Sequence, residues 1–432
     1  MNNMGKYDGK KLLILGSNVC ADDICNYAKQ HGAYVVVADW NPIEKSPAKR
    51  VADEALNIST ADIDALCEYV ERNQVDGVFA GISEFNLKSA RAVAEQCGLP
   101  FYCTESQWDS IERKDEFRQL CIEHSVPCPK TYYSGDADSI VWESIEYPVV
   151  LKPVDASASA GVYFCSNRVD VERHLDDTKR NSSTGKVIIE QFVVGDEFTA
   201  HYVICDGRAE LTCIDNRYPV AVHEGDVTTV PVARLFPCLY IDEYINQVDS
   251  RMCDLCESIG VKDGVLFVQG LYDSSSNRFA IFEAGLRSAG EAPSRFLKKV
   301  TGNDYMSIFV DVALGVKPNF DFSHNDPYLH GRCCGVVSFV GRGGEVCSVT
   351  GLPDAIEGLA DVVTYEKRYP VGSTIPNGDT LRQLAVRFVL DCPSRKALSD
   401  TVSLLNESVD VLGINGESLV IKMDPKRVFE AR

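Results

Sequence analysis

Residues 148–162 read PVVLKPVDASASAGV and join a short apolar run, a lysine and a series of small residues. The run from Val149 to Leu151 is typical of a short buried strand, which would deliver Lys152 to its open end. The residues from 156 to 161 are all small, so the backbone there can fold closely around an anion with its N–H groups pointing inward. The stretch favours a phosphate-binding loop. The alternative is a strand with a surface lysine, followed by a flexible loop.

Length and composition indicate a globular protein of several domains. With 432 residues the chain exceeds what one hydrophobic core usually fills, so we expect about three domains. Apolar residues make up 45% of the chain and charged residues 25%, as in globular proteins. No apolar run approaches the roughly 20 residues that span a bilayer, and Leu12 to Leu15 is too short for the core of a signal peptide. We therefore expect a cytoplasmic protein with no membrane partner.

Charge and cysteine usage narrow the expected partners. The formal net charge of −20 repels polyphosphate backbones, and the basic residues form no long run, so we expect no nucleic-acid partner. The 17 cysteines are odd in number and dispersed, which is typical of reduced thiols. Cys253 and Cys256 form the single CxxC, within an amphipathic helix pattern, and core packing is favoured there over zinc or redox chemistry.

The N-terminal third predicts a small parallel sheet. Strand patterns at 11–16 and 34–39 flank a helix pattern at 22–31. The alternation continues with helices at 62–73 and 86–97 and strands at 77–80 and 99–102. Only Gly16 of a G-x-G-x-x-G fingerprint is present, although Asp39 lies near the spacing for ribose binding, so a nicotinamide site is disfavoured. Thr104 and Gln107 have capping-box spacing and open a helical region, and we place the first domain boundary near residue 112.

Residues 131–194 predict a small α/β unit that contains the strand ending in Lys152. Further strands are expected at 162–165 and 187–192, with a helix from the Asn167 cap to about Thr178. The last strand leads into EQFVVGDEF, which places Glu190 at the strand end and Glu197 seven residues later. Extended backbone there can serve an adenine edge, and a carboxylate beyond it can accept from ribose hydroxyls. Ordinary surface carboxylates are the alternative.

Two hairpins and a C-terminal unit complete the expected fold. Asp206-Gly207 is typical of a hairpin turn, and the strands at 264–273 and 278–285 form a second hairpin. The second hairpin carries Gln269 and Glu283, and a glutamate at the end of an apolar strand is costly to bury unless it is paired or holds a metal. A Glu283–Arg287 ion pair is the alternative to a metal site. The C-terminal unit, with strand patterns at 335–341, 345–351 and 386–392 and a helix at 394–407, begins near residue 326.

Taken together, these segments resemble the ATP-grasp superfamily of ligases. The matching motifs are RKDEFR with Lys114, the stretch around Lys152, EQFVVGDE from Glu190 to Glu197, and FEAGLRSAG with Glu283 and Arg287. The resemblance implies an α/β protein with a Rossmann-like N-terminal domain (1–112) and an ATP-grasp domain of two α+β subdomains (113–325). The lid subdomain would span about 131–194. A small α+β C-terminal domain (326–432) would resemble that of amino-acid ligases.

The resemblance also implies a role for each candidate residue. Lys114 and Lys152 would contact the ATP phosphates. Ser157, Ser159 and Gly161 would belong to the lid loop. Adenine would lie against Glu190, Gln191, Phe192 and Val193, and Glu197 would bind the ribose. Gln269 and Glu283 would hold Mg²⁺ or Mn²⁺. Arg287 would face the acyl phosphate. His223, in VHEGD, resembles a His-x-Gly-Asp segment of carbamoyl-phosphate-synthase-type members and would lie near the nucleotide, with a solvated loop histidine as the alternative.

The implied activity is ATP-dependent ligation of a small-molecule carboxylate to an amine. An acyl phosphate would form, the amine would displace phosphate, and the products would be an amide or peptide, ADP and phosphate. Homodimers are the commonest assembly for such an enzyme. The chain departs from the family where Gly285 stands in place of the metal-binding asparagine, and at Ala158 and Ala160 in the loop. A nucleotide-binding protein with little turnover is therefore a second hypothesis, and an oxidoreductase that uses the N-terminal sheet is a third.

Overall fold

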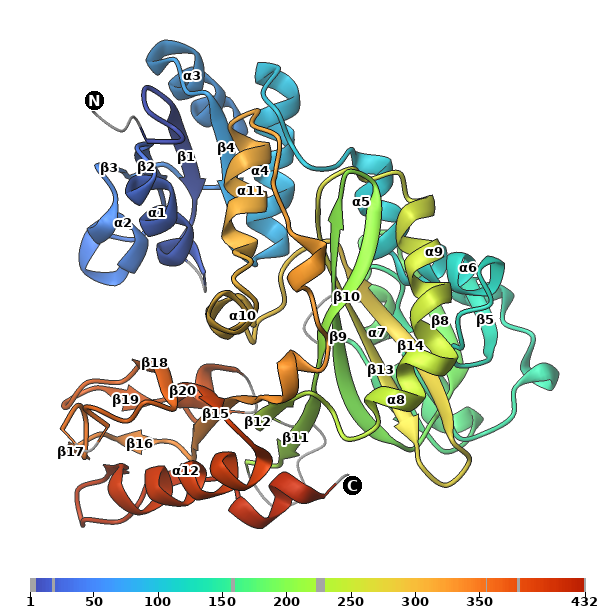
Figure 1. The fold of residues 1–432 in the computed structure, drawn as a ribbon. Coiled ribbons are helices and arrows are strands. Elements are labelled where there is room, and N and C mark those ends of the chain that lie inside the picture. Colours follow the sequence, from blue (N-terminus) through green and yellow to red (C-terminus); the bar gives the residue numbers. More distant parts are fainter. Residues whose placement is uncertain are drawn as a thin grey trace.

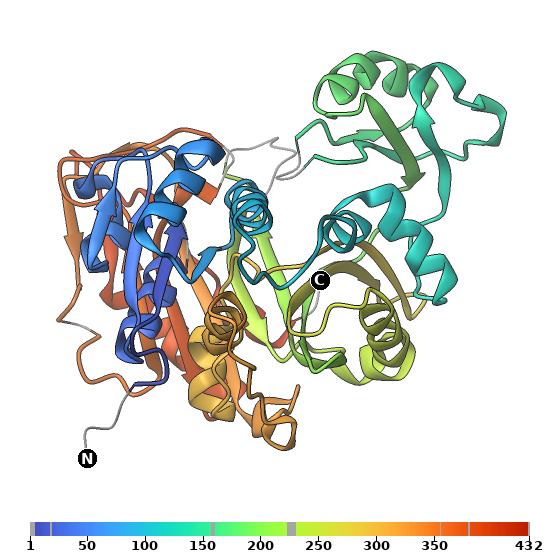
Figure 2. The ribbon, with the colours of Figure 1, turned by 90° about the horizontal axis from the view of Figure 1, so that it is seen from above.

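The computed structural model describes residues 5–17, 20–156, 160–222, 230–354, 356–378 and 381–430. An N-terminal α/β part and a C-terminal β-rich part lie on one side of the molecule, and a long hairpin sheet stands beside both (Figure 1). Seen from above, the segment from about 131 to 194 projects away from the rest (Figure 2).

The N-terminal part is a parallel sheet covered by helices. Its strand order is β3-β2-β1-β4, formed by Glu54–Leu56, Tyr34–Ala38, Lys11–Leu15 and Gly77–Ala80. The helices α1 to α4 span Ala21–Gln30, Pro47–Val51, Ile63–Asn73 and Glu84–Cys97. The parallel sheet predicted from the sequence is confirmed, but the strand predicted at 99–102 is wrong. Pro100 has no N–H to offer a ladder, and the fourth strand is β3, which the sequence did not indicate.

A helix from a distant part of the chain completes this N-terminal core. Helix α11 (Tyr305–Ala313) packs on β4, where Phe79 and Phe309 stack with ring centroids 4.8 Å apart. The side chain of Asp311 is fully buried, accepts a hydrogen bond from the Tyr7 hydroxyl at 2.7 Å and pairs with Lys6 at 2.6 Å. Figure 1 shows α11 beside α4 and β4. The first domain is thus closed by residues some 200 positions beyond its expected boundary.

Two short helices connect the N-terminal part to the segment that projects in Figure 2. The capping box predicted at Thr104 and Gln107 is confirmed and begins α5 (Glu105–Glu112). Arg113 has extended backbone angles, so the helix breaks there, and α6 (Lys114–Glu123) begins at the next residue. The projecting unit has its own hydrophobic core and an antiparallel sheet of order β5-β8-β6-β7. These strands are Thr131–Asp136, Lys186–Gln191, Val149–Pro153 and Tyr163–Cys165, with α7 (Arg168–Arg180) capped by Asn167 as predicted.

The long hairpins form the central sheet, of order β10-β9-β13-β14. Strands β9 (Asp196–Cys205) and β10 (Arg208–Ile214) flank the predicted Asp206-Gly207 turn, and both turn residues have positive φ. Strands β13 (Gly264–Asp273) and β14 (Arg278–Gly285) confirm the second predicted hairpin. Helices α8 (Ile241–Tyr244) and α9 (Ser250–Ser258), separated by a π-helical turn, cover this sheet.

The C-terminal sheet includes two strands from the middle of the sequence. Its order is β11-β12-β15-β20-β18, formed by Asn216–Val220, Val230–Phe236, Cys333–Gly341, Leu384–Cys392 and Val362–Lys367, with β22 (Val420–Ile421) on β15. The strand predicted at 345–351 is divided into β16 (Gly344–Glu345) and β17 (Ser348–Thr350), because the chain changes partner from β19 (Thr374–Ile375) to β21 (Asp410–Leu412). Helices α10 (Ser294–Thr301) and α12 (Arg395–Ser408) complete this part. Short 3₁₀ turns lie at Ile43–Lys45, Ala137–Ser139, Trp142–Ser144, Phe322–His324, Leu329–Gly331, Leu381–Gln383 and Pro425–Phe429.

Candidate active site

A buried charge cluster is centred on Glu190, at the end of β8. The register of β6 and β8 pairs Val150 with Glu190, which brings Lys152 of the neighbouring strand beside the same carboxylate. The Lys152 ammonium pairs with Glu190 Oε1, and the Arg118 guanidinium pairs with Oε2 at 2.7 Å. All three side chains are 5% exposed or less. The lysine is therefore delivered to an interior site and not to the surface.

The electrostatics of this cluster follow from its burial. Burial lowers the pKa of Lys152, because the charged form loses its hydration. Burial alone would raise the pKa of Glu190, but the charges of Lys152 and Arg118 outweigh it and hold that pKa below its usual range. Sequence reasoning missed Arg118, although it lies in the quoted RKDEFR motif. Its position one helical turn after Lys114 was the available signal.

A second lysine, Lys114, lies beside the start of the loop that follows Lys152. Lys114 is the first residue of α6 and is itself buried. Its ammonium donates to the carbonyl of Ala156 at 2.6 Å and lies 3.7 Å from Glu283 Oε1, at the end of β14. The Phe282 ring centroid is 5.9 Å from the Lys152 ammonium. Segments more than 100 residues apart in the sequence thus meet around these two lysines.

The loop that follows Lys152 is described only at its two ends. Ser157 and Ser159 lie outside the described residues, as does His223. Gly161 has φ +68°, and a Cβ at this position would approach Asn181 Cβ to 2.9 Å. The Gly161 carbonyl accepts from Thr178 Oγ1 at 3.0 Å, which fixes the end of the loop against α7. A side chain at 161 would therefore be strained both by its backbone and by its neighbours.

The predicted adenine and ribose positions lie where β8 leaves the projecting unit. The backbone N–H groups of Gln191 and Phe192 donate to the carbonyls of Lys130 and Pro148, at 2.8 and 3.3 Å. These two N–H groups therefore already have backbone acceptors. Val193 is the next residue along the segment. Glu197 pairs with the largely buried Arg217, so it is held by a charge and is not a free surface carboxylate. The side chain of Phe192 is partly exposed and lies edge-on to Phe164 at 4.6 Å.

The predicted metal positions face one another across a strand pair. Gln269 of β13 and Glu283 of β14 are direct cross-strand partners. Gly285 pairs with Phe267, and a Cβ at Gly285 would lie 2.4 Å from Phe267 Cε1. The aromatic ring therefore occupies the space that an asparagine side chain at 285 would need. Mg²⁺ commonly takes one or two carboxylates and completes its shell with phosphate oxygens and waters, so Gln269 and Glu283 fit such an ion.

Arg287 is held by acidic groups from other elements. Its guanidinium pairs with Glu84, at the start of α4, at 3.0 Å and lies over the Phe267 ring at 4.7 Å. Glu112 of α5 accepts from the Leu286 N–H at 3.2 Å, and burial, followed by the nearby Glu84, raises the Glu112 pKa well above its usual range. The alternative of a Glu283–Arg287 ion pair is wrong, since Glu283 pairs with Lys114 and Arg287 pairs with Glu84. The candidate site thus includes residues of the N-terminal part as well as of the central sheet.

A second buried cluster, which sequence reasoning missed, lies between the central and C-terminal sheets. Arg234 of β12 donates to Asp215 at 3.0 Å and lies 3.7 Å from Glu291 Oε1, and His201 of β9 lies 3.2 Å from the same oxygen. The charge of Arg234 and the adjacent His201 imidazole outweigh burial and keep the pKa of Glu291 low. No linear pattern joins these four positions. The cluster anchors the chain that follows Arg287.

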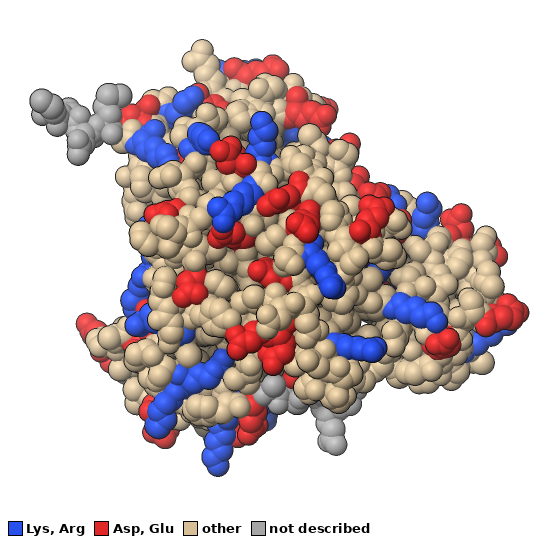
Figure 3. Space-filling model, turned by 45° about the vertical axis from the view of Figure 1, so that its right-hand side comes forward, with Lys and Arg blue, Asp and Glu red and all other residues tan. Residues whose placement is uncertain are grey.

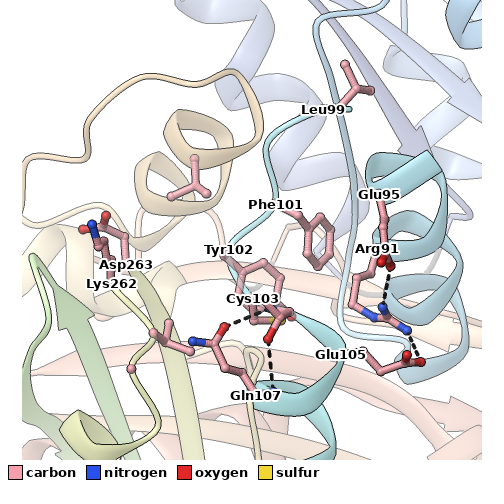
Figure 4. A pocket seen from close by; sticks show the side chains of 14 residues that line it. Arg91, Glu95, Leu99, Phe101, Tyr102, Cys103, Glu105, Gln107, Lys262 and Asp263 are labelled. Atoms are coloured by element: carbon pink, nitrogen blue, oxygen red, sulfur yellow. Dashed lines mark hydrogen bonds and ion pairs between the residues drawn. The ribbon is translucent and has the colours of Figure 1, made fainter. Parts of the chain in front are cut away.

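A separate cavity of about 500 Å³ lies between the N-terminal part and the central sheet. Its lining includes the apolar residues Phe101 and Val261. Arg91, which also lines the cavity, donates hydrogen bonds to Glu95 and Glu105 (Figure 4). Tyr102, in its wall, donates to the Leu286 carbonyl at 2.8 Å.

The face of the molecule in Figure 3 shows basic and acidic side chains interspersed. No helix among the described residues is long and apolar enough to cross a bilayer.

Comparisons with known proteins agree on the type of domain in the middle of the chain. Residues 145–294 match the ATP-grasp domain family. It is 24% identical over 331 residues to the carbamoyl phosphate synthase large chain of Clostridium perfringens. That match covers 71% of this chain and 30% of the relative, so the chain spans about a third of the length of the curated relatives it matches.

Solved structures agree on the fold. The L-amino acid ligase of Bacillus licheniformis superposes with a TM-score of 0.75 at 17% identity, over 94% of this chain and 99% of that chain. The biotin carboxylase of Campylobacter jejuni, in complex with an ATP analogue, gives 0.74 at 16% identity, over 97% and 94%. The phosphoribosylglycinamide synthetase of Anaerococcus prevotii gives 0.73 at 14% identity, over 94% and 99%. The ATP-grasp fold predicted from the sequence is confirmed.

Proposed function

We propose that the protein is an ATP-dependent carboxylate–amine ligase that forms an amide or peptide bond through an acyl phosphate. The observation that carries this proposal is the convergence of both lysines on the end of β14, where Lys114 lies 3.7 Å from Glu283 and Lys152 lies 5.9 Å from the Phe282 ring centroid, together with Gln269 directly opposite Glu283. The phosphate oxygens of a triphosphate require cations, which the two lysines supply. The metal ion bound to the triphosphate requires oxygen ligands, which the central sheet supplies.

Each residue has a separate task in this proposal. The Lys114 and Lys152 ammonium groups would bind phosphate oxygens, and Glu190 would keep Lys152 charged and oriented until the nucleotide arrives. Gln269 and Glu283 would hold Mg²⁺, or Mn²⁺, which when bound neutralises charge on the phosphates. Glu190 to Val193 would line the adenine, and Glu197 with Arg217 the ribose. In such a site catalysis comes from positioning and charge stabilisation rather than from covalent participation of the protein.

The reaction would proceed in two substitutions. The carboxylate oxygen of the first substrate attacks the γ-phosphorus, the bond to the β–γ bridging oxygen breaks, and ADP leaves. The amine then attacks the acyl carbon, phosphate leaves, and the amine loses a proton. Arg287 would stabilise the negative charge on the acyl phosphate, and Glu84 would hold the guanidinium in place. A small-residue lid from 156 to 161 would exclude the water that hydrolyses the anhydride.

The test is ADP release from the purified chain with magnesium, over panels of carboxylates and amines. Substrate-dependent ADP release that falls at least 100-fold in Lys114→Met and Lys152→Met is the expected result. Lys396→Met removes an exposed lysine that pairs with Asp400 and serves as the matched control. If Lys114→Met and Lys152→Met both bind the nucleotide as tightly as the wild type, the assignment of these lysines to the nucleotide site is wrong.

The position of Phe267 favours a second candidate, a nucleotide-binding protein with weak turnover. The ring fills the space of the third metal ligand, so the first shell has fewer protein oxygens. ATP binding without ADP release over a broad panel would support this candidate. The double substitution Phe267→Ala with Gly285→Asn makes room for the missing ligand and should raise turnover above that of Phe267→Ala alone. No rise would show that the missing asparagine does not limit the reaction.

A further inference from the structure

The chain after Arg287 passes beneath the N-terminal sheet at the point where a ligand is expected. In the order β3-β2-β1-β4, the chain passes from β1 to β2 on one side of β1 and later returns to place β4 on its other side, and open α/β sheets bind ligands outside the carboxyl ends of strands where the order reverses. The segment 286–291 runs along this edge. Arg287 pairs with Glu84, just after β4, and a Cβ on Gly290 would lie 3.7 Å from Ile82 Cδ1.

Arg387, from the C-terminal sheet, reaches the same segment. It lies in β20, is only 7% exposed, and donates from Nη2 to the Gly290 carbonyl at 2.7 Å. Its Nε is buried and has no hydrogen-bond partner among the described residues. No described carboxylate lies within the 4.0 Å limit of an ion pair to its guanidinium. Glu366 is its cross-strand neighbour but makes no such pair.

Two other buried arginines of this protein have a carboxylate partner, although the Nε of Arg118 is also buried without a hydrogen bond among the described residues. Arg118 pairs with Glu190 at 2.7 Å, and Arg234 pairs with Asp215 at 3.0 Å. Glu291, one residue from the carbonyl that Arg387 binds, is engaged by Arg234 and His201. A buried charge without a partner is costly, and proteins retain such groups mainly where a ligand supplies the counter-charge. Arg387 is therefore a buried cation that a bound anion could neutralise.

A second guanidinium lies nearby. Arg295, in the first turn of α10, is 16% exposed and uses Nε to bind Asp23, in the first turn of α1, at 2.9 Å. Burial raises the pKa of the Cys20 thiol to about 12, and both Arg295 and Arg387 act in the opposite direction. Helix α10, which carries Arg295, packs against β20, which carries Arg387, and Asp23 belongs to α1, the helix that follows β1. The planar forks of the two guanidinium groups suit carboxylate and phosphate oxygens.

We infer that Arg387 and Arg295 form an oxyanion site that binds an anionic group of a substrate, other than the carboxylate that is phosphorylated. The inference rests on the proposed ligase function. It defines the substrate class as an acid or amine that carries a further carboxylate or phosphate. The anion would lie against the segment that carries Arg287, so its binding would place the reacting group at a fixed distance from the nucleotide.

The test is isothermal titration of the full chain saturated with Mg²⁺ and a non-hydrolysable ATP analogue, which occupies the triphosphate site. Methylphosphonate probes a phosphate group and succinate a carboxylate, and tighter binding of one identifies the class. Arg387→Met should weaken binding of the preferred anion by about 10- to 100-fold, as expected for a charge-assisted, two-pronged contact. The exposed Arg342→Met, in the same domain, should leave it unchanged.

The controls separate this site from a structural role and from the ligase proposal. Arg387→Met should melt without ligand at or above the wild-type temperature, because a buried unpaired charge is removed. Arg387→Lys keeps the charge but loses the fork and should bind several-fold more weakly; it decides the question if the methionine variant does not fold. Wild-type anion affinity in the folded Arg387 variant, or no anion binding by the wild type, would overturn the inference. Anion binding without any turnover would instead remove only the ligase proposal.

Discussion

Replacing Glu190 by glutamine should destabilise the protein far more than its single lost charge suggests. The wild-type carboxylate neutralises two cations, Lys152 and Arg118, that are 5% and 4% exposed. Glutamine is nearly isosteric, so packing is preserved, but both cations lose their counter-charge in the interior. Breaking a buried ion pair by removing one partner costs about 3 to 5 kcal/mol. We expect Glu190→Gln to lie within this range.

Urea unfolding followed by tryptophan fluorescence measures the effect, because Trp142 lies in the projecting unit that contains Lys152 and Glu190. Glu172→Gln is the matched control. It breaks an exposed i,i+4 pair with Arg168 and should cost no more than about 0.5 kcal/mol. The double variant Lys152→Met with Glu190→Gln should recover part of the loss, since one unpaired cation is removed with the carboxylate.

The pH dependence gives an independent check. The folded-state pKa of Glu190 is depressed, so its stabilising contribution is present above the unfolded pKa of about 4.3 and is lost as the pH falls through the folded value. The difference in unfolding free energy between wild type and Glu190→Gln should be constant from about pH 6 to 8 and shrink in acid. A difference below about 1 kcal/mol at pH 7, or one that grows in acid, would refute the reasoning.

Three further outcomes are expected. Glu84→Gln should lower kcat/KM by about 10-fold with the ATP analogue affinity unchanged, because it frees the Arg287 guanidinium without touching the lysines; a change in nucleotide affinity alone would contradict this. Gly285→Ala should cost about 1 to 3 kcal/mol in unfolding free energy by overpacking against Phe267, whereas Gly264→Ala on β13, whose nearest neighbour would be 3.5 Å away, should cost less than about 1 kcal/mol. Asp311→Ala should cost about 2 to 4 kcal/mol by stranding the Tyr7 hydroxyl and the Lys6 ammonium, measured by thermal unfolding, and no change in stability would show that α11 does not anchor the N-terminal core.

The sequence was most informative where a local pattern fixes local structure. The capping box at Thr104, the hairpin at 264–285 and the Asn167 cap are found where their residues predict them. A turn or cap is set by its own backbone and neighbouring donors, so a few consecutive residues suffice. The strand predicted at 99–102 failed because its apolar residues pack around a proline without joining a ladder.

The sequence by itself determined the ATP-grasp fold and the residues that resemble its motifs, because those motifs are contiguous and keep their order along the chain. Only the tertiary structure decided which charges meet. Glu190 pairs with Lys152 and Arg118, Arg287 is held by Glu84 from the N-terminal part, and Arg387 has one backbone acceptor among the described residues. Pairing between charges depends on distance and burial, which are set by strand register and domain packing, and no spacing along the chain encodes either.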